Sequence, residues 1–438
     1  MEKKLSIISG LTLAATFLAL GLTAAAEKTT AYEKPPIKLN AALIVPDGKM
    51  EGKGYQIEET ALNDGYSNTY NLKTEVGTVD AVSDYQLARQ IQEVRALIIL
   101  DEMSRAGVFG EGMKNGLMAP LKAGKALITD PVDTTTGAIK GVGRWMGNIG
   151  RAITSDDPYQ EGGVSAAVGW AGAKRAYALK LGVDPYTDWE PLQEGLTSVA
   201  QAAFAGGITV GVAMGKITEG TTVGTVTTVL SLSGDMNKIL LDNPPEGLTK
   251  INREKLVQMN IPQKTTDPFL ANYNYTPMEK TLLVESLKRM DGAQGRDIFL
   301  SEAASAPDRE VARYMQQRAE MMANYHNKTM ATDIIKIDKT LWQLNRKGTL
   351  LGIFPIDYLA WTTGASRIAA SAEKSPKAKQ REIWLEGSAS PESNKALTAR
   401  GWKVKERVGL LTGNPLQNQT AASAGAKATT TVIKTITP

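Results

Sequence analysis

The sequence lacks cysteine altogether, contains a single histidine and is poor in aromatic residues, which make up 6% of the chain. Without cysteine there is no disulfide, no thiolate nucleophile, no zinc finger and no iron–sulfur cluster. One histidine excludes zinc sites built from several imidazoles and leaves at most one imidazole-based catalytic unit. We therefore assign no metal, no cofactor and no catalytic residue from the sequence.

The composition is that of a folded protein that begins with an export signal. Of the 438 residues, 22% are charged and 42% are hydrophobic, and the length allows two or three domains. Two lysines precede an apolar run over 5–22, and the Thr-Ala-Ala-Ala sequence at 23–26 contains an A-x-A cleavage site. This pattern predicts a signal peptide and places the mature protein in the periplasm or outer cell envelope. An uncleaved membrane anchor is the alternative.

Hydrophobic periodicity changes along the chain. Apolar residues at helical spacing follow an expected N-cap at Ser83 and continue to about residue 330. Strand patterns follow, including a hairpin that turns through 345–348. We therefore expect an α+β protein, in which a large Gly-rich, mainly α-helical domain is followed by a small α/β module. The expected segments are a signal peptide (1–26), a linker and short β-containing segment (27–82), the helical domain (83–330), a basic small α/β module (331–411) and a disordered Ala/Thr-rich tail (412–438).

The charge is unevenly distributed. The whole chain has a net charge of +4, whereas residues 331–438 contain 16 Lys and Arg against 8 Asp and Glu. A basic C-terminal part on an acidic body indicates an anionic neighbour, such as lipid headgroups or an envelope polymer. An effect on solubility alone is the alternative, and no nucleic-acid partner is expected.

A weakly hydrophobic, Gly-rich stretch spans 195–234, and its first 21 residues carry no charge. Ala203, Gly207, Gly211 and Gly215 are spaced four apart, so a single helix would place them on one face. Such a stripe lets another helix approach closely, as in membrane helix pairs. The pattern predicts either a hairpin that contacts a membrane or a protein partner, or a close-packed helix pair in a soluble core. The Thr-rich second half also suits a β-hairpin.

A second unusual segment is the amphipathic stretch 137–153. Lys140, Arg144 and Arg151 fall opposite an apolar stripe, and Trp145 is the kind of aromatic residue that lies at headgroup depth. A helix with these features can lie in a membrane interface, where its basic residues would contact phosphates. The alternative is a helix that packs on the protein's own core.

Candidate catalytic groups are few. His326 falls on a Met-rich helical pattern, and we expect it to be a partly buried structural residue. No nucleophile elbow, P-loop or HExxH motif occurs. Oxygen ligands for Ca²⁺ could come from five acidic residues, namely Asp156, Asp157, Asp184, Asp188 and Glu190. No twelve-residue calcium loop is present, and Asp beside Pro is more simply explained by turn chemistry. The sequence leaves open whether a pair of carboxylates is catalytic, because the 46 acidic residues offer no distinguishing pattern.

Three segments carry a similarity to other proteins: 181–186 (Leu-Gly-Val-Asp-Pro-Tyr), 352–358 (Gly-Ile-Phe-Pro-Ile-Asp-Tyr) and 399–402 (Ala-Arg-Gly-Trp). They resemble a group of exported bacterial cell-envelope proteins with no assigned activity. The similarity would cover most of the mature chain. It implies export and does not imply an activity.

These patterns favour a non-enzymatic binding or scaffold protein of the cell envelope. Its expected contact residues for membrane or partner are Lys140, Arg144, Trp145, Arg151, Gly207, Gly211 and Gly215. Two alternatives stay open, namely a carboxylate-dependent hydrolase that acts on envelope polymer and a subunit of a larger envelope assembly.

Overall fold

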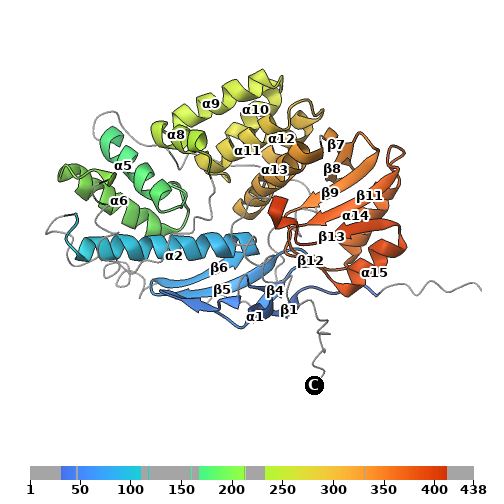
Figure 1. The fold of residues 1–438 in the computed structure, drawn as a ribbon, viewed down its shortest axis with the longest axis horizontal. Helices are drawn as coiled ribbons and strands as arrows, with labels where there is room; N and C mark the ends of the chain where they lie inside the picture. Colours follow the sequence, from blue (N-terminus) through green and yellow to red (C-terminus); the bar gives the residue numbers. More distant parts are fainter. Residues whose placement is uncertain are drawn as a thin grey trace, which may run out of the picture.

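Two multi-stranded β-sheets, one from each end of the described sequence, are joined by a series of helices (Figure 1), and a third sheet has only two strands. The computed structural model describes residues 31–45, 48–109, 117, 159, 167–211, 213, 232–329 and 331–411. The structure is 51% helix and 20% strand.

The N-terminal sheet has six antiparallel strands in the order β1-β4-β5-β3-β2, with β6 paired to β5. Alternate residues of β5 are buried, and Asn68, Tyr70 and Leu72 share the covered face. Burial with a period of two is typical of a sheet with one covered face. The elements are β1 (Ile37–Asn40), α1 (Ala41–Ile44), β2 (Glu51–Gly52), β3 (Tyr55–Ile57), β4 (Thr60–Asn63), β5 (Asn68–Thr74) and β6 (Gly77–Val82).

Helix α2 (Asp84–Arg105) packs on this sheet. Ser83 begins the helix, because its Oγ accepts a hydrogen bond from the N–H of Gln86 at 3.1 Å. Sixteen of the 22 residues of α2 are buried. The sheet covers one side of the helix, and α6 (Glu190–Ala205), which packs against α5 (Ala167–Lys180), covers another (Figure 1). Polar side chains on such a helix need partners inside the protein.

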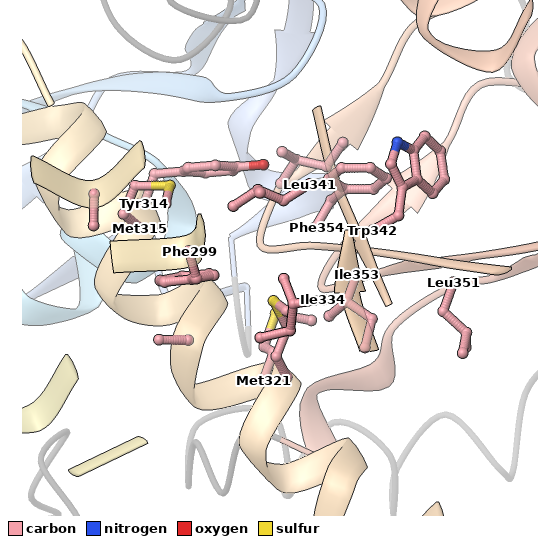
Figure 2. Packing of buried hydrophobic residues seen from close by; sticks show 14 of the residues in the cluster. Phe299, Tyr314, Met315, Met321, Ile334, Leu341, Trp342, Leu351, Ile353 and Phe354 are labelled. Carbon is pink, nitrogen blue, oxygen red and sulfur yellow. The ribbon is translucent and has the colours of Figure 1, made fainter. Parts of the chain in front are cut away.

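The remaining helices share a second core with the C-terminal sheet. This sheet has the order β13-β11-β9-β8-β7, in which β9, β11 and β13 are parallel. Figure 2 shows Phe299 of α12 and Met315 of α13 on the helical side of this core and Trp342 and Phe354 on the sheet side, and all four belong to one buried cluster. The elements are α8 (Gly234–Asp242), α9 (Pro245–Gln258), α10 (Gln263–Leu270), α11 (Pro277–Arg289), α12 (Arg296–Ala304), α13 (Arg309–Thr329), β7 (Ala331–Ile337), β8 (Thr340–Asn345), β9 (Thr349–Phe354), β10 (Tyr358–Leu359), α14 (Thr363–Glu373), β11 (Gln380–Leu385), β12 (Ser388–Ala389), α15 (Pro391–Ala399), β13 (Trp402–Lys405) and a final 3₁₀ turn, η3 (Val408–Leu411).

The expected fold class, a large Gly-rich helical domain followed by a small α/β module, is wrong. Helices are distributed along the whole described chain, and each multi-stranded sheet shares its core with helices. One hydrophobic cluster includes Tyr66 and extends from Leu256 in α9 to Trp402 in β13, across the expected boundary at residue 330. Periodicity identifies an element but does not show which other element its apolar face packs against. The pattern therefore suggested a division that the packing does not make.

Many single elements lie where the sequence predicts them. Helix α2 follows Ser83, and the β8–β9 hairpin turns through 345–348. Helix α15 begins with Pro391 after Ser390, whose Oγ accepts from the N–H of Ser393 at 3.0 Å. The short helices α8, α10 and α12 were not predicted. Strand β1 and helix α1 fall within the stretch that was expected to be a linker.

Candidate functional site

A cluster of buried charges joins α2 to α11. Nη1 of Arg89 donates to Oε1 of Glu279 at 2.9 Å, and Nη2 of Arg89 lies 3.8 Å from Oδ2 of Asp184. Thr276 caps α11 by exchanging two hydrogen bonds with Glu279, and its hydroxyl donates to Oδ2 of Asp184 at 2.6 Å. All three charged residues are buried. Charges in such positions are tolerated when they are paired and hydrogen-bonded.

Two arginines of α13 complete the cluster. Nε of Arg309 and Nη2 of Arg313 bind the two oxygens of Asp188, at 2.6 and 2.7 Å. The same two side chains approach Oε1 of Glu279, to 3.7 Å from Nη2 of Arg309 and 3.5 Å from Nε of Arg313. Nη1 of Arg309 also donates to the hydroxyl of Tyr159 at 2.9 Å. Three guanidinium groups therefore surround one glutamate.

The electrostatics of the charge cluster indicate a structural role, in which it holds helices of the fold together. Burial alone would raise the pKa of Glu279, but the charges of Arg309, Arg89 and Arg313 outweigh it and lower the pKa from 4.5 to about 2. Burial raises the pKa of Asp184, although Arg89 opposes this shift. A glutamate with so low a pKa stays ionised and is a poor proton donor near neutral pH. The cluster therefore suits fastening helices better than acid–base chemistry.

A pair of carboxyl groups links the two cores. The oxygens of Asp357 accept from the backbone N–H of Asn68 at 2.8 Å and of Asp84 at 3.1 Å. Oδ1 of Asp84 accepts from the hydroxyl of Tyr70 at 2.5 Å and from the amide of Asn68 at 3.0 Å. Burial raises the pKa of both carboxyl groups, and the charge of Asp84 raises the pKa of Asp357 further. The pair connects β5 and the start of α2 to the loop after β9.

Five exposed cations gather where the C-terminal sheet begins its parallel strands. We call this surface the basic edge; it consists of Arg346, Lys347, Lys374, Lys377 and Lys379. Two loops supply it, the β8–β9 turn and the α14–β11 loop. They are adjacent because the N–H of Lys379 donates to the carbonyl of Gly348 at 2.8 Å, and the stem of Lys379 lies close to Gly348.

The basic edge has no carboxylate of its own. None of its five side chains makes an ion pair with a carboxylate in the part of the chain that the structure describes. Glu373, which precedes the α14–β11 loop, is bound by Arg400 at 2.9 Å and by Nε1 of Trp402 at 2.8 Å. Positive charge therefore accumulates here without local compensation, which favours an anionic partner.

A pocket of about 330 Å³ lies between α9, α10 and α11. The rings of Tyr159 and Tyr273 form part of its wall, together with Asn252 and Lys280. Tyr159 also contacts the charge cluster through Arg309. Helix α11 therefore contributes to both the pocket and the charge cluster.

The residues predicted to contact membrane or partner are placed only in part. Lys140, Arg144, Trp145, Arg151 and Gly215 lie outside the described residues. Helix α6 ends at Ala205, and Gly207 has a φ of 62°, in the left-handed region that ends helices. The four-residue stripe is therefore not carried by one continuous helix from Ala203 to Gly211. A contact role for Gly207 and Gly211 stays a prediction.

Other expectations from the sequence concern residues that the structure describes. His326 is buried, with 5% of its surface exposed. Oδ1 of Asp184 accepts from the N–H of Tyr186 at 2.9 Å, as expected for a turn, and Asp188 binds two arginines. Within the described ranges, no group of three or more His, Cys, Asp or Glu residues could hold a metal ion.

Sequence reasoning predicted a basic C-terminal part facing an anionic neighbour, but it identified neither the residues of the basic edge nor the pocket. The Lys-Ser-Pro-Lys-Ala-Lys sequence at 374–379 was a signal for the first. No local pattern signals the second, because its wall comes from three helices.

Among the helices that the structure describes, none has the length and apolar character needed to cross a membrane. Comparisons with protein-family models, curated proteins and solved structures find no match to this chain.

Proposed function

We propose that this is an exported, non-enzymatic protein of the cell envelope that binds an anionic envelope polymer through the basic edge. The observation that carries the proposal is the group of five exposed cations on two adjacent loops, none of them paired with a carboxylate of the described chain. The signal-peptide pattern at the N-terminus supports export.

The apolar surface favours a polymer over a membrane as the partner. Stable binding to a membrane surface needs buried apolar area in addition to basic residues. The exposed large hydrophobic side chains of the described chain are Tyr32, Leu43, Phe204, Leu241 and Val257. None of the five lies on the two loops that supply the basic edge, so these loops present no exposed large apolar side chain to insert among lipids.

A charge-neutralising variant tests the proposal. We expect the purified protein to bind polygalacturonate, and to bind it more weakly as the salt concentration rises. Replacing Lys347, Lys377 and Lys379 by Gln removes three charges, each worth about 1 kcal/mol next to an anionic surface. Their sum of about 3 kcal/mol predicts affinity roughly a hundredfold lower at low salt.

The matched control replaces Lys38, Lys180 and Lys250 by Gln. These three lysines are exposed on other parts of the protein, so the control has the same net charge as the test variant. We expect the control to bind polygalacturonate like the unmodified protein. Equal losses in the two variants, or an absence of polygalacturonate binding, would refute the proposal. Stronger binding to phosphatidylglycerol vesicles than to the polymer would refute the choice of partner.

A further inference from the structure

Residues 31–36 form a strap that lies on the C-terminal part of the protein. The strap contains no helix or strand, and β1 of the N-terminal sheet begins directly after it. The hydrogen bonds of Tyr32 and Glu33 go to residues at least 328 positions further along the chain. The N–H of Glu33 donates to the carbonyl of Trp361 at 2.9 Å, and the ring of Tyr32 stacks on the ring of Trp361 with 6.5 Å between the centroids. The strap is therefore held by backbone, ring and side-chain contacts, as a bound peptide is.

The carboxylate of Glu33 is bound by two donors, the backbone N–H of Trp361 and the hydroxyl of Ser390, which we call the Glu33 cradle. Oε2 of Glu33 accepts from both donors, each at 2.5 Å. The distance to Ser390 is that of a charge-assisted hydrogen bond. Ser390 is also the N-cap of α15, because its Oγ accepts from the N–H of Ser393 at 3.0 Å. The carboxylate therefore lies at the end of a helix that favours negative charge.

The donors of the Glu33 cradle depend on the strap for their partner. Ser390 and Trp361 are 0% and 3% exposed, whereas Tyr32 of the strap is 50% exposed and Lys34 is exposed as well. The strap is thus the outer layer at this place. When it lifts, the two donors and one face of the Trp361 ring open to solvent and lose their partners. A carboxylate from another molecule could then reach the cradle and restore the hydrogen bonds.

The contacts of the strap define which ligand fits. The two donors suit a carboxylate, the ring of Trp361 suits an aromatic side chain just before it, and the carbonyl of Trp361 suits a backbone N–H. A polysaccharide carries carboxylates but no backbone N–H next to an aromatic ring. Both donors are neutral groups, so hydrogen bonding selects the ligand more than net charge does. The combination describes an acidic peptide segment.

From these observations we infer that the Glu33 cradle recognises an acidic peptide segment of another protein, in which an aromatic residue precedes a glutamate, and that the strap blocks this site until the partner binds. Because the strap belongs to the same chain, its effective concentration at the cradle is high. A partner displaces it only by making further contacts elsewhere, so the strap acts as an autoinhibitory segment. The site is separate from the basic edge and does not depend on it.

The test uses a labelled peptide and a variant whose strap cannot fill the cradle. The peptide has the sequence of residues 31–36, Ala-Tyr-Glu-Lys-Pro-Pro, with blocked ends and a fluorescent label, and its binding to the purified protein is followed by fluorescence anisotropy. We expect Glu33→Ala to bind the peptide at least tenfold more tightly than the unmodified protein does. One Glu and one Lys leave the peptide without net charge, so the basic edge does not attract it. Equal binding to the two proteins would overturn the inference.

Two further measurements examine the chemistry of the cradle in Glu33→Ala. A peptide with Gln in place of Glu should bind at least tenfold more weakly than the original peptide. Acetate should raise the unfolding midpoint of this variant more than it raises that of the unmodified protein, at concentrations where chloride does not. A purely structural contact would give a lower midpoint with neither peptide binding nor rescue by acetate, and that result would overturn the inference.

Glu254→Ala is the matched control, because Glu254 is exposed on α9 and the substitution changes the net charge equally. We expect it to bind the peptide like the unmodified protein, and binding as tight as that of Glu33→Ala would overturn the assignment to the cradle. Glu33→Gln covers the case in which Glu33→Ala does not fold, and it should also bind the peptide more tightly than the unmodified protein. A dimer of the unmodified protein in sedimentation experiments that Glu33→Ala abolishes would overturn the choice of another protein as the partner, since a second copy would then supply the segment.

Discussion

Neutralising Glu279 should destabilise the protein more than any exposed substitution. Gln at this position still accepts from the N–H of Thr276, so Glu279→Gln keeps the cap of α11 and removes only the charge. The substitution leaves Arg89, Arg309 and Arg313 without their shared counter-charge. Breaking a buried ion pair by removing one partner costs about 3–5 kcal/mol.

The pKa of Glu279 gives an independent magnitude. A fall from 4.5 to about 2 corresponds to about 3 kcal/mol of stability at neutral pH. Because the pKa is lowered in the folded state, this stability is present above the unfolded-state value of 4.5 and is lost as the pH falls through about 2. The cost of breaking the ion pairs and the pKa shift therefore both predict that Glu279→Gln lowers the free energy of unfolding by about 3 kcal/mol at neutral pH, and that this loss shrinks in acid.

Urea unfolding followed by circular dichroism measures this loss across the pH range from neutral to acid. Glu254→Gln is the control, since Glu254 is exposed on α9, and we expect it to change the free energy of unfolding by less than about 0.5 kcal/mol. A loss below about 1 kcal/mol for Glu279→Gln at neutral pH would refute the reasoning. So would a loss that stays constant as the pH falls.

Two further predictions concern the link between the cores. The folded-state pKa values of Asp84 and Asp357 are raised, so the contribution of these two carboxyl groups to the free energy of unfolding is largest in acid and is lost as the pH rises through their folded-state values. Asp84→Asn should change the slope of stability against pH over this range by up to about 1.4 kcal/mol per pH unit. An unchanged slope in urea titrations at several pH values would contradict this. A Cβ on Gly387 would lie 1.8 Å from the carbonyl oxygen of Asp357, so Gly387→Ala should cost about 2 kcal/mol or more, whereas Gly234→Ala, with nothing within 4 Å, should change stability by less than about 1 kcal/mol; equal melting temperatures for the two variants would be the contrary result.

Local signals predicted many elements because their causes are local. The Ser83 side chain caps α2, and Pro391 suits the first turn of α15, and both effects act within a few residues. The β8–β9 hairpin was recognisable because two apolar runs are separated by a short polar turn. Short helices were missed where local signals conflict, as in α10, which contains Pro268.

The arrangement of these elements could not be predicted because its causes are distant in the sequence. Arg89 and Glu279 are 190 residues apart, and no spacing rule connects them. The same holds for Asn68 and Asp357, which are 289 residues apart and join the two cores. The Gly-stripe interpretation assumed a continuous helix, but the chain leaves helical geometry at Gly207.

Hydrogen-bond pairing separates the polar groups that hold this fold together from those that are available to a ligand. Glu279 and Asp357 are surrounded by donors from the protein itself, so their desolvation is compensated before any ligand arrives. The cations of the basic edge, by contrast, make no ion pair with a carboxylate of the described chain. Binding at the basic edge gains interactions that folding leaves unmade, whereas binding to the charge cluster would first have to break existing ion pairs. For this reason we propose the basic edge as the binding surface for the polymer and assign a structural role to the buried charges.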